Sequence, residues 1–544
     1  MNRNQIKFSL EFLLLGIAPV FLYAMILCFY TPNLMDYLRE MIDLSLTCFL
    51  IYAIGFLIPI DFLKRLWLCL LLSLFSLIVF FKLSFYYLFE SKLTLSAFYI
   101  ILETNASETK DFFSLYFNWI IGTLFLLIFI PIVRQLHLLV AHQTRFNSLG
   151  LYNGHSKMNF RFTILIIGGI FISIYIINKK TKALNIAYTS IDAYKSYHEM
   201  QDIFKNDLGQ SESDHFFNIK SEDHEQTYVL VIGESTTSRN MSLYGYERET
   251  NPLLEEIKDE LLVFNDVISP HAHTIPSLNK ALSFSNYENE EDYNLGSLIQ
   301  VMNAANFETY WLSNQKPLGL YENMITLLSK ASDQQVFLSE DNHQYGAYDE
   351  YLLDPLNELL SQSVNKKFII VHLMGTHSVY KHRYPSKYDF FNDIPKTKFP
   401  SDKATEMINT YDNALRYNDF VVREIIESVR KEKTNAYVIY LSDHGEEVFQ
   451  DIDFVGHSEH RGSRTMFEIP FLVWLSEGFR KSDSKNHLYE NYLDRKYLTD
   501  DLIHSILDLS QVKLNLFKPE RSIFNSNFKT RQRIIKGTID YDKQ

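Results

Sequence analysis

The chain has 544 residues, of which 47% are hydrophobic and 15% aromatic, and its net charge at pH 7 is −13. This length exceeds one ordinary domain, and the apolar residues are concentrated at the front. After residue 178 there are 56 acidic and 40 basic residues, a net charge of −16 that argues against a nucleic-acid partner. Such an excess of acid chiefly favours solubility, and it is compatible with cation binding.

Five apolar runs lie in the first 178 residues, and each approaches the ~20 residues that a membrane-spanning helix needs. A cleaved signal peptide is the alternative for the first run, but that run lacks a small-residue cleavage site and four more follow it. The sequence therefore predicts a five-helix transmembrane domain at 1–178, with spans near 8–30, 44–62, 66–89, 113–133 and 162–177.

Basic residues in the short loops between these runs predict the orientation of the chain. They are more numerous on the side of the N-terminus, which we therefore expect to be cytoplasmic. An odd number of spans places everything after residue 178 outside. Lys179, Lys180 and Lys182 run against the rule, but long domains are translocated largely regardless of charge.

All three cysteines, Cys28, Cys48 and Cys69, lie in predicted spans, so the exported part has no disulfide and no zinc–thiolate site.

A polar linker with helical segments is expected at 179–226, followed by a single domain at 227–544. In this domain short apolar runs alternate with helical stretches, which predicts a mostly parallel sheet covered by helices on both faces. We expect a long amphipathic helix at 403–430 and strands at 228–233, 262–268, 308–313, 334–339, 367–373, 435–442 and 470–475.

Two of these strands end in groups that bind metals. YVLVIGE ends at Glu234, and AYVIYLSDHGE carries Asp443 and His444 just after its apolar part. Neighbouring parallel strands deliver such side chains to one edge of the sheet. An isolated Glu or an Asp–His pair is usually a surface feature, but oxygen and nitrogen ligands converging here are suited to zinc.

A hydroxyl group stands between these strands in sequence, at Thr274 of HTIPSL, just before a helix predicted at 277–284. A helix start attracts anions, so a nucleophile that attacks a phosphate is expected there. Thr274 has competitors in Ser235, Thr236 and Thr237, and it could also serve as an N-cap for the helix.

Ten short motifs in this order resemble the phosphoethanolamine transferases of Gram-negative envelopes, which are membrane-anchored members of the alkaline phosphatase and sulfatase superfamily. The resemblance implies an α/β alkaline phosphatase-like domain in the periplasm, anchored in the bacterial inner membrane. The motifs are GES at 233–235, YGY at 244–246, Arg248, TNP at 250–252, HTIPSL at 273–278, WLSNQ at 311–315, GTH at 375–377, YDNALRYND at 411–419, SDHGEE at 442–447 and GHS at 456–458.

The resemblance also implies roles for residues. Glu234, Asp443 and His444 would hold zinc, with Thr274 as the fourth ligand. TIPSL is similar to the sulfatase motif C-x-P-S-R, with Thr274 in place of the modified cysteine. Threonine cannot become formylglycine, so it would carry the phosphoryl group itself, which counts against a sulfatase.

His377 and His457 match histidines that in the family contact the phosphate or a second zinc. Lone histidines are more often structural, and four others lie close by in sequence: His271, His273, His382 and His460.

Asn314 resembles the asparagine that holds the phosphoethanolamine group, whereas the role of Lys316 is open because its spacing differs from that in the lipid A enzymes. In the outer loop 90–111, Asn105 and Glu108 resemble a TN-x-x-E pattern that would face the lipid donor, where a carboxylate suits a cationic headgroup. These loop residues could equally be solvated.

The resemblance implies a zinc-dependent transfer of phosphoethanolamine from phosphatidylethanolamine, by way of Thr274, to lipopolysaccharide or another envelope glycan. The partners would be membrane lipid and this acceptor, with no nucleic acid, and we expect a monomer. Lipid A phosphate, core heptose or Kdo, and a periplasmic glucan are all open as acceptors. Core sugars are favoured because several lipid A-modifying relatives carry disulfides that are missing here. A glycerophosphate transferase, a phosphatase or sulfatase, and a non-catalytic receptor are the alternatives.

Overall fold

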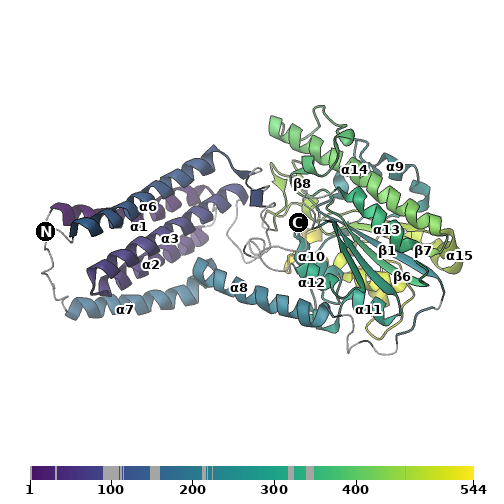
Figure 1. Cartoon of the computed structure of the whole chain (residues 1–544), viewed down its shortest axis with the longest axis horizontal. Helices are drawn as coiled ribbons and strands as arrows, with labels where there is room; N and C mark the ends of the chain where they lie inside the picture. The colour runs from purple at the N-terminus through teal and green to yellow at the C-terminus, as the bar shows by residue number, and fades with distance from the viewer. Residues whose placement is uncertain are drawn as a thin grey trace. The chain divides into compact units, whose positions relative to one another are not determined.

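The computed structural model describes residues 3–30, 34–89, 98, 109–110, 113, 116–146, 160–210, 216, 219–222, 224–315, 324–338, 348–459 and 461–544. These residues form two compact units. The first contains the described residues up to 98 and those from Phe113 to Tyr197, and the second contains 109–110 and the described residues from His198 onward, so that the last boundary lies between Tyr197 and His198. The first unit is helical, and the second contains the sheet (Figure 1). The boundary falls within the predicted linker 179–226.

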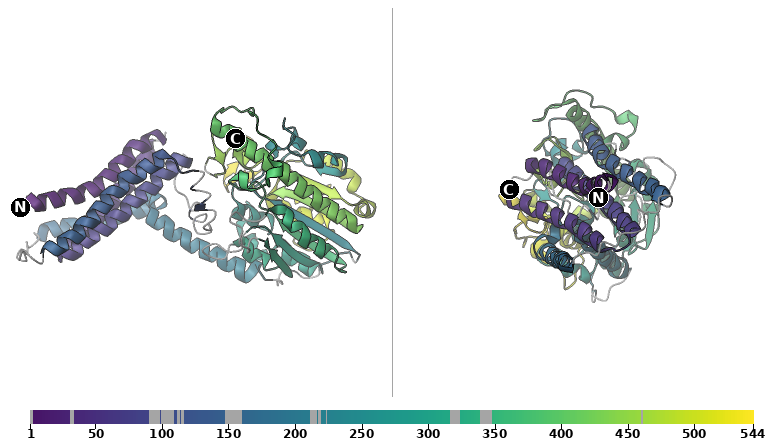
Figure 2. Two further views of the ribbon diagram at one scale, coloured as in Figure 1. Left: turned by 45° about the horizontal axis from the view of Figure 1, so that its top comes forward. Right: turned by 90° about the vertical axis from the view of Figure 1, so that its left-hand side faces the viewer.

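The helices of the first unit run beside one another, as Figure 2 shows, with α3 packed against α1, α2 and α6, and α7 packed against α2. The bounds are α1 (Arg3–Tyr30), α2 (Leu34–Leu57), α3 (Asp61–Phe89), α6 (Trp119–Phe146) and α7 (Phe160–Ile176). A π-helical turn (Ile177–Thr181) and a 3-10 turn (Lys182–Leu184) then lead into α8 (Ile186–Ile203).

Three helices among the described residues are long and apolar enough to cross a bilayer, namely Leu34–Leu57, Phe62–Phe89 and Phe160–Leu184. The apolar stretches described in the other two, Gly16–Phe29 and Trp119–Arg134, are shorter than a full span. Each of the five predicted spans therefore overlaps a helix, although 44–62 runs past the end of α2 and 113–133 begins before α6, and three of the helices meet the length and composition of a membrane crossing.

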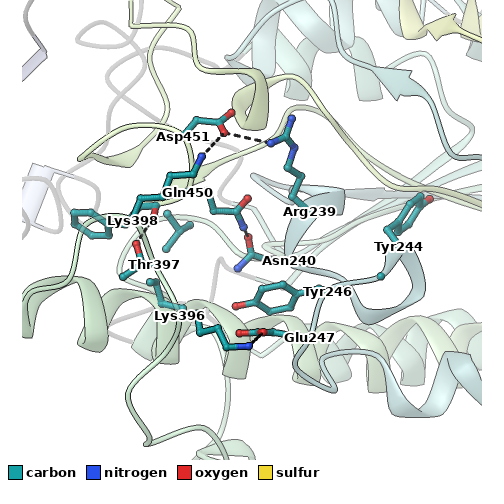
Figure 3. A pocket seen from close by; sticks show the side chains of 14 residues that line it. Arg239, Asn240, Tyr244, Tyr246, Glu247, Lys396, Thr397, Lys398, Gln450 and Asp451 are labelled. Carbon is teal, nitrogen blue, oxygen red and sulfur yellow. Dashed lines mark hydrogen bonds and ion pairs between the residues drawn. The ribbon is translucent and has the colours of Figure 1, made fainter.

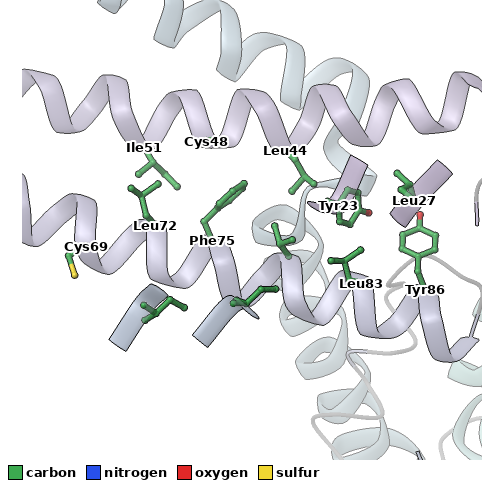
Figure 4. Close-up of a cluster of buried hydrophobic side chains, with 13 residues drawn as sticks. Tyr23, Leu27, Leu44, Cys48, Ile51, Cys69, Leu72, Phe75, Leu83 and Tyr86 are labelled. Atoms are coloured by element: carbon green, nitrogen blue, oxygen red, sulfur yellow. The ribbon is translucent and has the colours of Figure 1, made fainter. Parts of the chain in front are cut away.

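One face of α3 forms the centre of the helical unit. Leu72, Phe75, Leu83 and Tyr86 recur at helical spacing and are buried against α1 and α2 (Figure 4). The opposite face exposes large apolar side chains, among them Phe81. A helix that is apolar on both faces is expected where lipid covers the outer one.

A buried polar cluster interrupts this apolar interior. The Lys82 ammonium of α3 donates to the Glu40 carboxylate of α2 at 2.7 Å and to the Leu184 carbonyl at 2.8 Å. Asp43, one turn after Glu40, accepts from Thr181 at 3.1 Å and from Asn185 at 2.9 Å. Buried ions are costly unless they are paired, so these contacts fix the turn after α7 to α2 and α3.

Lys82→Met is expected to lower the free energy of unfolding by about 3 kcal/mol or more, because Glu40 then loses its buried cationic partner. The double variant Glu40→Gln/Lys82→Met should recover most of that loss. Unfolding of the full-length protein in detergent, followed by circular dichroism, measures both effects. Lys180→Met, at an exposed lysine near the same turn, is the matched control. Equal losses in the single and the double variant would contradict a role for the pair.

The second unit is built on a seven-stranded sheet with the order β2-β10-β7-β1-β6-β4-β5. β7, β1, β6, β4 and β5 are parallel. At one side β10 pairs antiparallel with β7, and β2 pairs antiparallel with β10 and so runs in the direction of the parallel strands. The bounds are β1 (Gln226–Gly233), β2 (Leu261–Val263), β4 (Glu308–Ser313), β5 (Gln334–Phe337), β6 (Lys366–His372), β7 (Asn435–Ser442) and β10 (Phe471–Leu475).

Helices cover both faces of this sheet, with α14 on one side and α11 and α12 on the other (Figure 1). The bounds are α9 (Pro252–Glu255), α10 (Thr274–Ala281), α11 (Leu298–Ala304), α12 (Met324–Ser329), α13 (Leu353–Leu360), α14 (Asp402–Glu432), α15 (Glu477–Ser482) and α16 (Leu502–Leu509). Small two-stranded pairings complete the unit: β3 (Val267–Ile268) with β11 (Tyr497–Leu498), β8 (Glu447–Val448) with β9 (Val455–Gly456), and β12 (Ile534–Ile535) with β13 (Ile539–Asp540).

The predicted fold class is confirmed, and the long helix lies within two residues of its predicted bounds. One strand prediction is wrong: 262–268 is not continuous. β2 and β3 are separate, because β2 pairs with β10 and β3 pairs with β11.

Candidate active site

The central strands bring two acidic residues to one point of the sheet edge. β1 and β7 are in register through Gly233 and Ser442, and the Asp443 amide donates to the Gly233 carbonyl at 3.0 Å. Glu234 and Asp443 each follow the last residue of their strand. The parallel pairing therefore sets the two carboxylates side by side, as the sequence predicts.

His444 completes a buried group with these carboxylates. Its Nε2 atom lies 3.3 Å from Glu234 Oε1 and 3.4 Å from Asp443 Oδ2, and all three side chains are buried. Asp443 Oδ2 and His444 Nε2 have no hydrogen-bond partner among the described residues. Buried polar atoms are rarely left in this state, and one nitrogen and two carboxylates are ligands that zinc accepts, so the residues fit a zinc ion.

Protons compensate for the crowded charge when no cation is bound. Burial and the charge of Glu234 raise the pKa of Asp443. Burial opposes a charge on His444, but the two carboxylates raise its pKa well above that of an ordinary imidazole. For Glu234 burial is outweighed by His444, which holds the pKa of this carboxyl low. A divalent cation would replace these protons, so we expect its binding to release them.

Thr274 touches this group directly. Its hydroxyl donates to both oxygens of Glu234, each at 3.2 Å. The residue is the first of α10, and His273 occupies the N-cap position, so the N-cap alternative for Thr274 is wrong. The helix begins three residues before the predicted start at Ser277, which places Thr274 in the helix's first turn.

The competing hydroxyls are less accessible. Ser235 also donates to Glu234, at 3.0 Å, but it is fully buried, as are Thr236 and Thr237, whereas Thr274 is partly exposed. Thr237 is further engaged with the Glu468 carbonyl at 3.1 Å. Of the four hydroxyls, only that of Thr274 combines contact with Glu234 and access for a substrate.

His457 and His377 lie at the same site. The His457 ring is 4.3 Å from that of His444 between centroids, and its Nδ1 is 2.7 Å from Glu446. His444, Glu446 and His457 form a second group with metal-ligand geometry. Burial lowers the pKa of His377 to about 3, and a charge on either His377 or His457 would help to keep the pKa of Glu234 low. The neutral His377 ring can offer one N–H donor and one lone pair.

Asn314 and Gln315 are neighbours in the chain but contact different residues of the site. The Asn314 amide donates to Asp349 at 2.8 Å, and Asp349 also accepts from the backbone of Met374 and of Gly375. Gln315 donates to Glu234 Oε2 at 3.1 Å. Gln315 is thus a site residue that the sequence analysis missed, although it stands in the same WLSNQ motif.

Gly375 in the GTH motif is required by close packing. It has φ of +53°, and a Cβ there would lie 2.7 Å from the Glu234 amide nitrogen. The loop that carries His377 can therefore approach Glu234 only with glycine at this position. Asn105, Glu108, Lys316 and His460 lie outside the described residues.

Comparison with known proteins places this geometry in a family. The sulfatase family model matches residues 226–512, more than half of the chain. The chain belongs to the sulfatase family. It is 37% identical over 341 residues to phosphoethanolamine transferase EptC of Escherichia coli (strain K12), and 36% over 342 residues to CptA of Salmonella typhimurium. Each match covers 60% of this chain and 59% of the relative, so it spans less than two thirds of those proteins.

Two solved structures extend the likeness. The C-terminal periplasmic domain of E. coli EptC, in complex with Zn, has a TM-score of 0.57 at 37% identity, covering 60% of this chain and 95% of that domain. The integral membrane protein EptA from Neisseria meningitidis has a TM-score of 0.69 at 18% identity, covering 94% and 97%, and it shares the fold. The predicted resemblance to the phosphoethanolamine transferases is confirmed.

Other motifs of this sulfatase-family chain brace the site. Asp412 in YDNALRYND accepts from Asn240 at 2.9 Å, Tyr246 at 3.0 Å and Arg248 at 2.8 Å. The Tyr411 hydroxyl donates to the Ser235 carbonyl at 2.9 Å and accepts from the Thr237 amide at 3.0 Å. These contacts tie the loop after Glu234 to α14, which explains why motifs so far apart in sequence belong together.

Proposed function

We propose that the protein transfers phosphoethanolamine from phosphatidylethanolamine to lipopolysaccharide, on a core sugar or on lipid A, through a phosphoethanolamine–Thr274 intermediate. The observation that carries this proposal is the contact of the Thr274 hydroxyl with Glu234, beside the Asp443 and His444 atoms that have no hydrogen-bond partner among the described residues. The similarity to the phosphoethanolamine transferases EptC and CptA supports phosphoethanolamine as the transferred group.

The first step forms a bond between Thr274 Oγ1 and phosphorus and breaks the bond from phosphorus to the diacylglycerol oxygen. The threonine proton leaves and diacylglycerol takes up a proton, so the step is balanced. Glu234 orients the hydroxyl, and the start of α10 offers backbone N–H groups to the phosphoryl oxygens.

In the second step the phosphoethanolamine group leaves Thr274 for an oxygen of the acceptor. An acceptor hydroxyl or phosphate oxygen attacks phosphorus, and Thr274 Oγ1 departs and regains a proton. The neutral His377 can move that proton or donate to a phosphoryl oxygen, and His457 is oriented for the same work by Glu446. A metal held by Glu234, Asp443, His444 and Thr274 would supply positive charge that activates the hydroxyl.

The remaining parts of the proposal concern the membrane. The membrane-spanning helices keep the catalytic unit in the compartment of its lipid donor, for which we propose the periplasmic side of the inner membrane. Asn105 and Glu108 are proposed to bind the ethanolamine headgroup, and Asn314 to position the transferred group. A monomer suffices for these roles.

Incubation of the full-length protein with phosphatidylethanolamine and no acceptor tests the proposal. Mass spectrometry of the digested protein should find phosphoethanolamine on the peptide that contains Thr274, and addition of lipopolysaccharide should discharge it. Phosphatidylglycerol in place of the donor should leave Thr274 unmodified. Labelling by glycerophosphate, or release of the group to water at the same rate with and without acceptor, would overturn the proposal in favour of the related activities.

A further inference from the structure

A cavity of about 750 Å³ lies in the second unit and contains none of the residues assigned to the reaction. Its volume falls within the range of about 300–1,000 Å³ that is typical of ligand sites. It is formed by the segments 239–247 and 448–451, together with 396–398 from the loop before α14 (Figure 3).

Two of these wall segments continue directly from the metal-binding residues. Arg239 is the fifth residue after Glu234, and Val448 is the fourth after His444. Because a chain extends by at most ~3.6 Å per residue, both walls begin within about 18 Å of the candidate ligands. The β8–β9 pairing also links the cavity to the site, since β8 ends at Val448 and His457 follows β9.

The walls offer the groups that bind sugars. Figure 3 shows the Tyr246 ring between Asn240 and the ion pair of Lys396 with Glu247. Tyr246 is anchored by its hydroxyl to Asp412 at 3.0 Å, so the ring is held in place. Aromatic faces and amide groups are the usual partners of a saccharide's C–H faces and hydroxyls.

Charge distinguishes this cavity from the rest of the unit. Arg239, Lys396 and Lys398 outnumber Glu247 and Asp451 in the lining, whereas the chain after residue 178 carries a net charge of −16. The Lys396 and Lys398 side chains are 85% and 72% exposed. The Lys398 ammonium lies 3.9 Å from the Asp451 carboxylate, so a ligand anion can approach both ammonium groups without displacing a buried pair.

We propose that this cavity binds an anionic sugar of the acceptor, one that carries a phosphate group, and so holds the acceptor chain while its reactive oxygen lies at Thr274. Lys396 and Lys398 recognise the anion, and Tyr246 supports the ring. This inference rests on the proposed function and names the substrate class of its second step.

The double variant Lys396→Ala/Lys398→Ala tests the inference in the full-length protein. The probe is the core oligosaccharide of lipopolysaccharide released by mild acid, used intact and after enzymatic dephosphorylation. The variant should raise the KM for the intact oligosaccharide about tenfold or more, the loss expected for a charged contact. Formation of the Thr274 intermediate from phosphatidylethanolamine should stay at the wild-type rate. Added salt should raise the wild-type KM and affect the variant less.

Lys481→Ala/Lys485→Ala is the matched control. Lys481 is paired with Glu477, as Lys396 is with Glu247, and Lys485 lies 3.9 Å from Asp508, as Lys398 does from Asp451. It should leave the acceptor KM unchanged. An unaltered acceptor KM in the cavity variant, or an equal loss with the dephosphorylated oligosaccharide, would overturn the inference. Direct binding of the oligosaccharide, measured by calorimetry without donor, separates this failure from a failure of the proposed function, since binding does not require transfer.

Discussion

Thr274→Ala is expected to abolish transfer, with a loss of at least about a thousandfold, because removal of the proposed covalent nucleophile leaves only binding and electrostatic effects. The variant should still bind zinc through Glu234, Asp443 and His444. Labelled phosphatidylethanolamine should leave no modified peptide. Turnover with lipopolysaccharide and metal content by plasma mass spectrometry are the two measurements.

Ser235→Ala is the matched control for this prediction. Ser235 donates to the same carboxylate but is fully buried, so its loss should cost far less than that of Thr274. Thr274→Ser should retain part of the activity, since it keeps the hydroxyl and loses the β-methyl group that restricts its rotamer. Full activity in Thr274→Ala, or loss of activity only in Ser235→Ala, would place the nucleophile after β1 instead.

The sheet and the convergence of Glu234, Asp443 and His444 could be predicted because local sequence encodes them. Apolar runs that end in Glu234 and in Asp443 are typical of buried parallel strands, and pairing of neighbouring strands brings their ends together. The start of α10 was misplaced for a local reason too. Pro276 lacks the N–H that a helix interior needs, but in the first turn that group has no partner within the helix, so the helix extends back to Thr274.

Other features depend on contacts that local sequence does not specify. Asn314 and Gln315 both follow β4, and only the tertiary structure decides that Gln315 meets Glu234 and Asn314 meets Asp349. The cavity likewise combines segments some 150 residues apart. The sequence does predict that Lys82 needs a buried partner, because a charge inside an apolar run is costly unless it is paired. It does not predict that the partner is Glu40, since this depends on how the helices pack.

Asp443→Asn is expected to remove bound zinc and transfer together while the fold is kept. Asparagine preserves the shape of the side chain but not the charge that a zinc ligand needs. The affinity for zinc should therefore fall by more than about 100-fold, which is the largest loss expected for a residue that only supports a ligand. Asp453→Asn, at an exposed position between β8 and β9, is the matched control and should keep both zinc and activity.

The stability of the metal-free variant separates loss of a ligand from damage to the fold. In the metal-free protein burial and Glu234 raise the pKa of Asp443 above its value in the unfolded chain. The contribution of Asp443 to the free energy of unfolding is therefore fully present at low pH, and it is lost as the pH rises through the pKa that Asp443 has in the folded protein. The asparagine side chain of Asp443→Asn does not titrate, so with chelator present the variant should unfold at the same or a higher temperature than wild type, and its advantage should grow toward alkaline pH. Thermal unfolding between about pH 6 and 9, with and without zinc, measures this. A variant that is less stable without zinc at every pH would show that Asp443 maintains the fold, and retained zinc with turnover would remove it from the metal site.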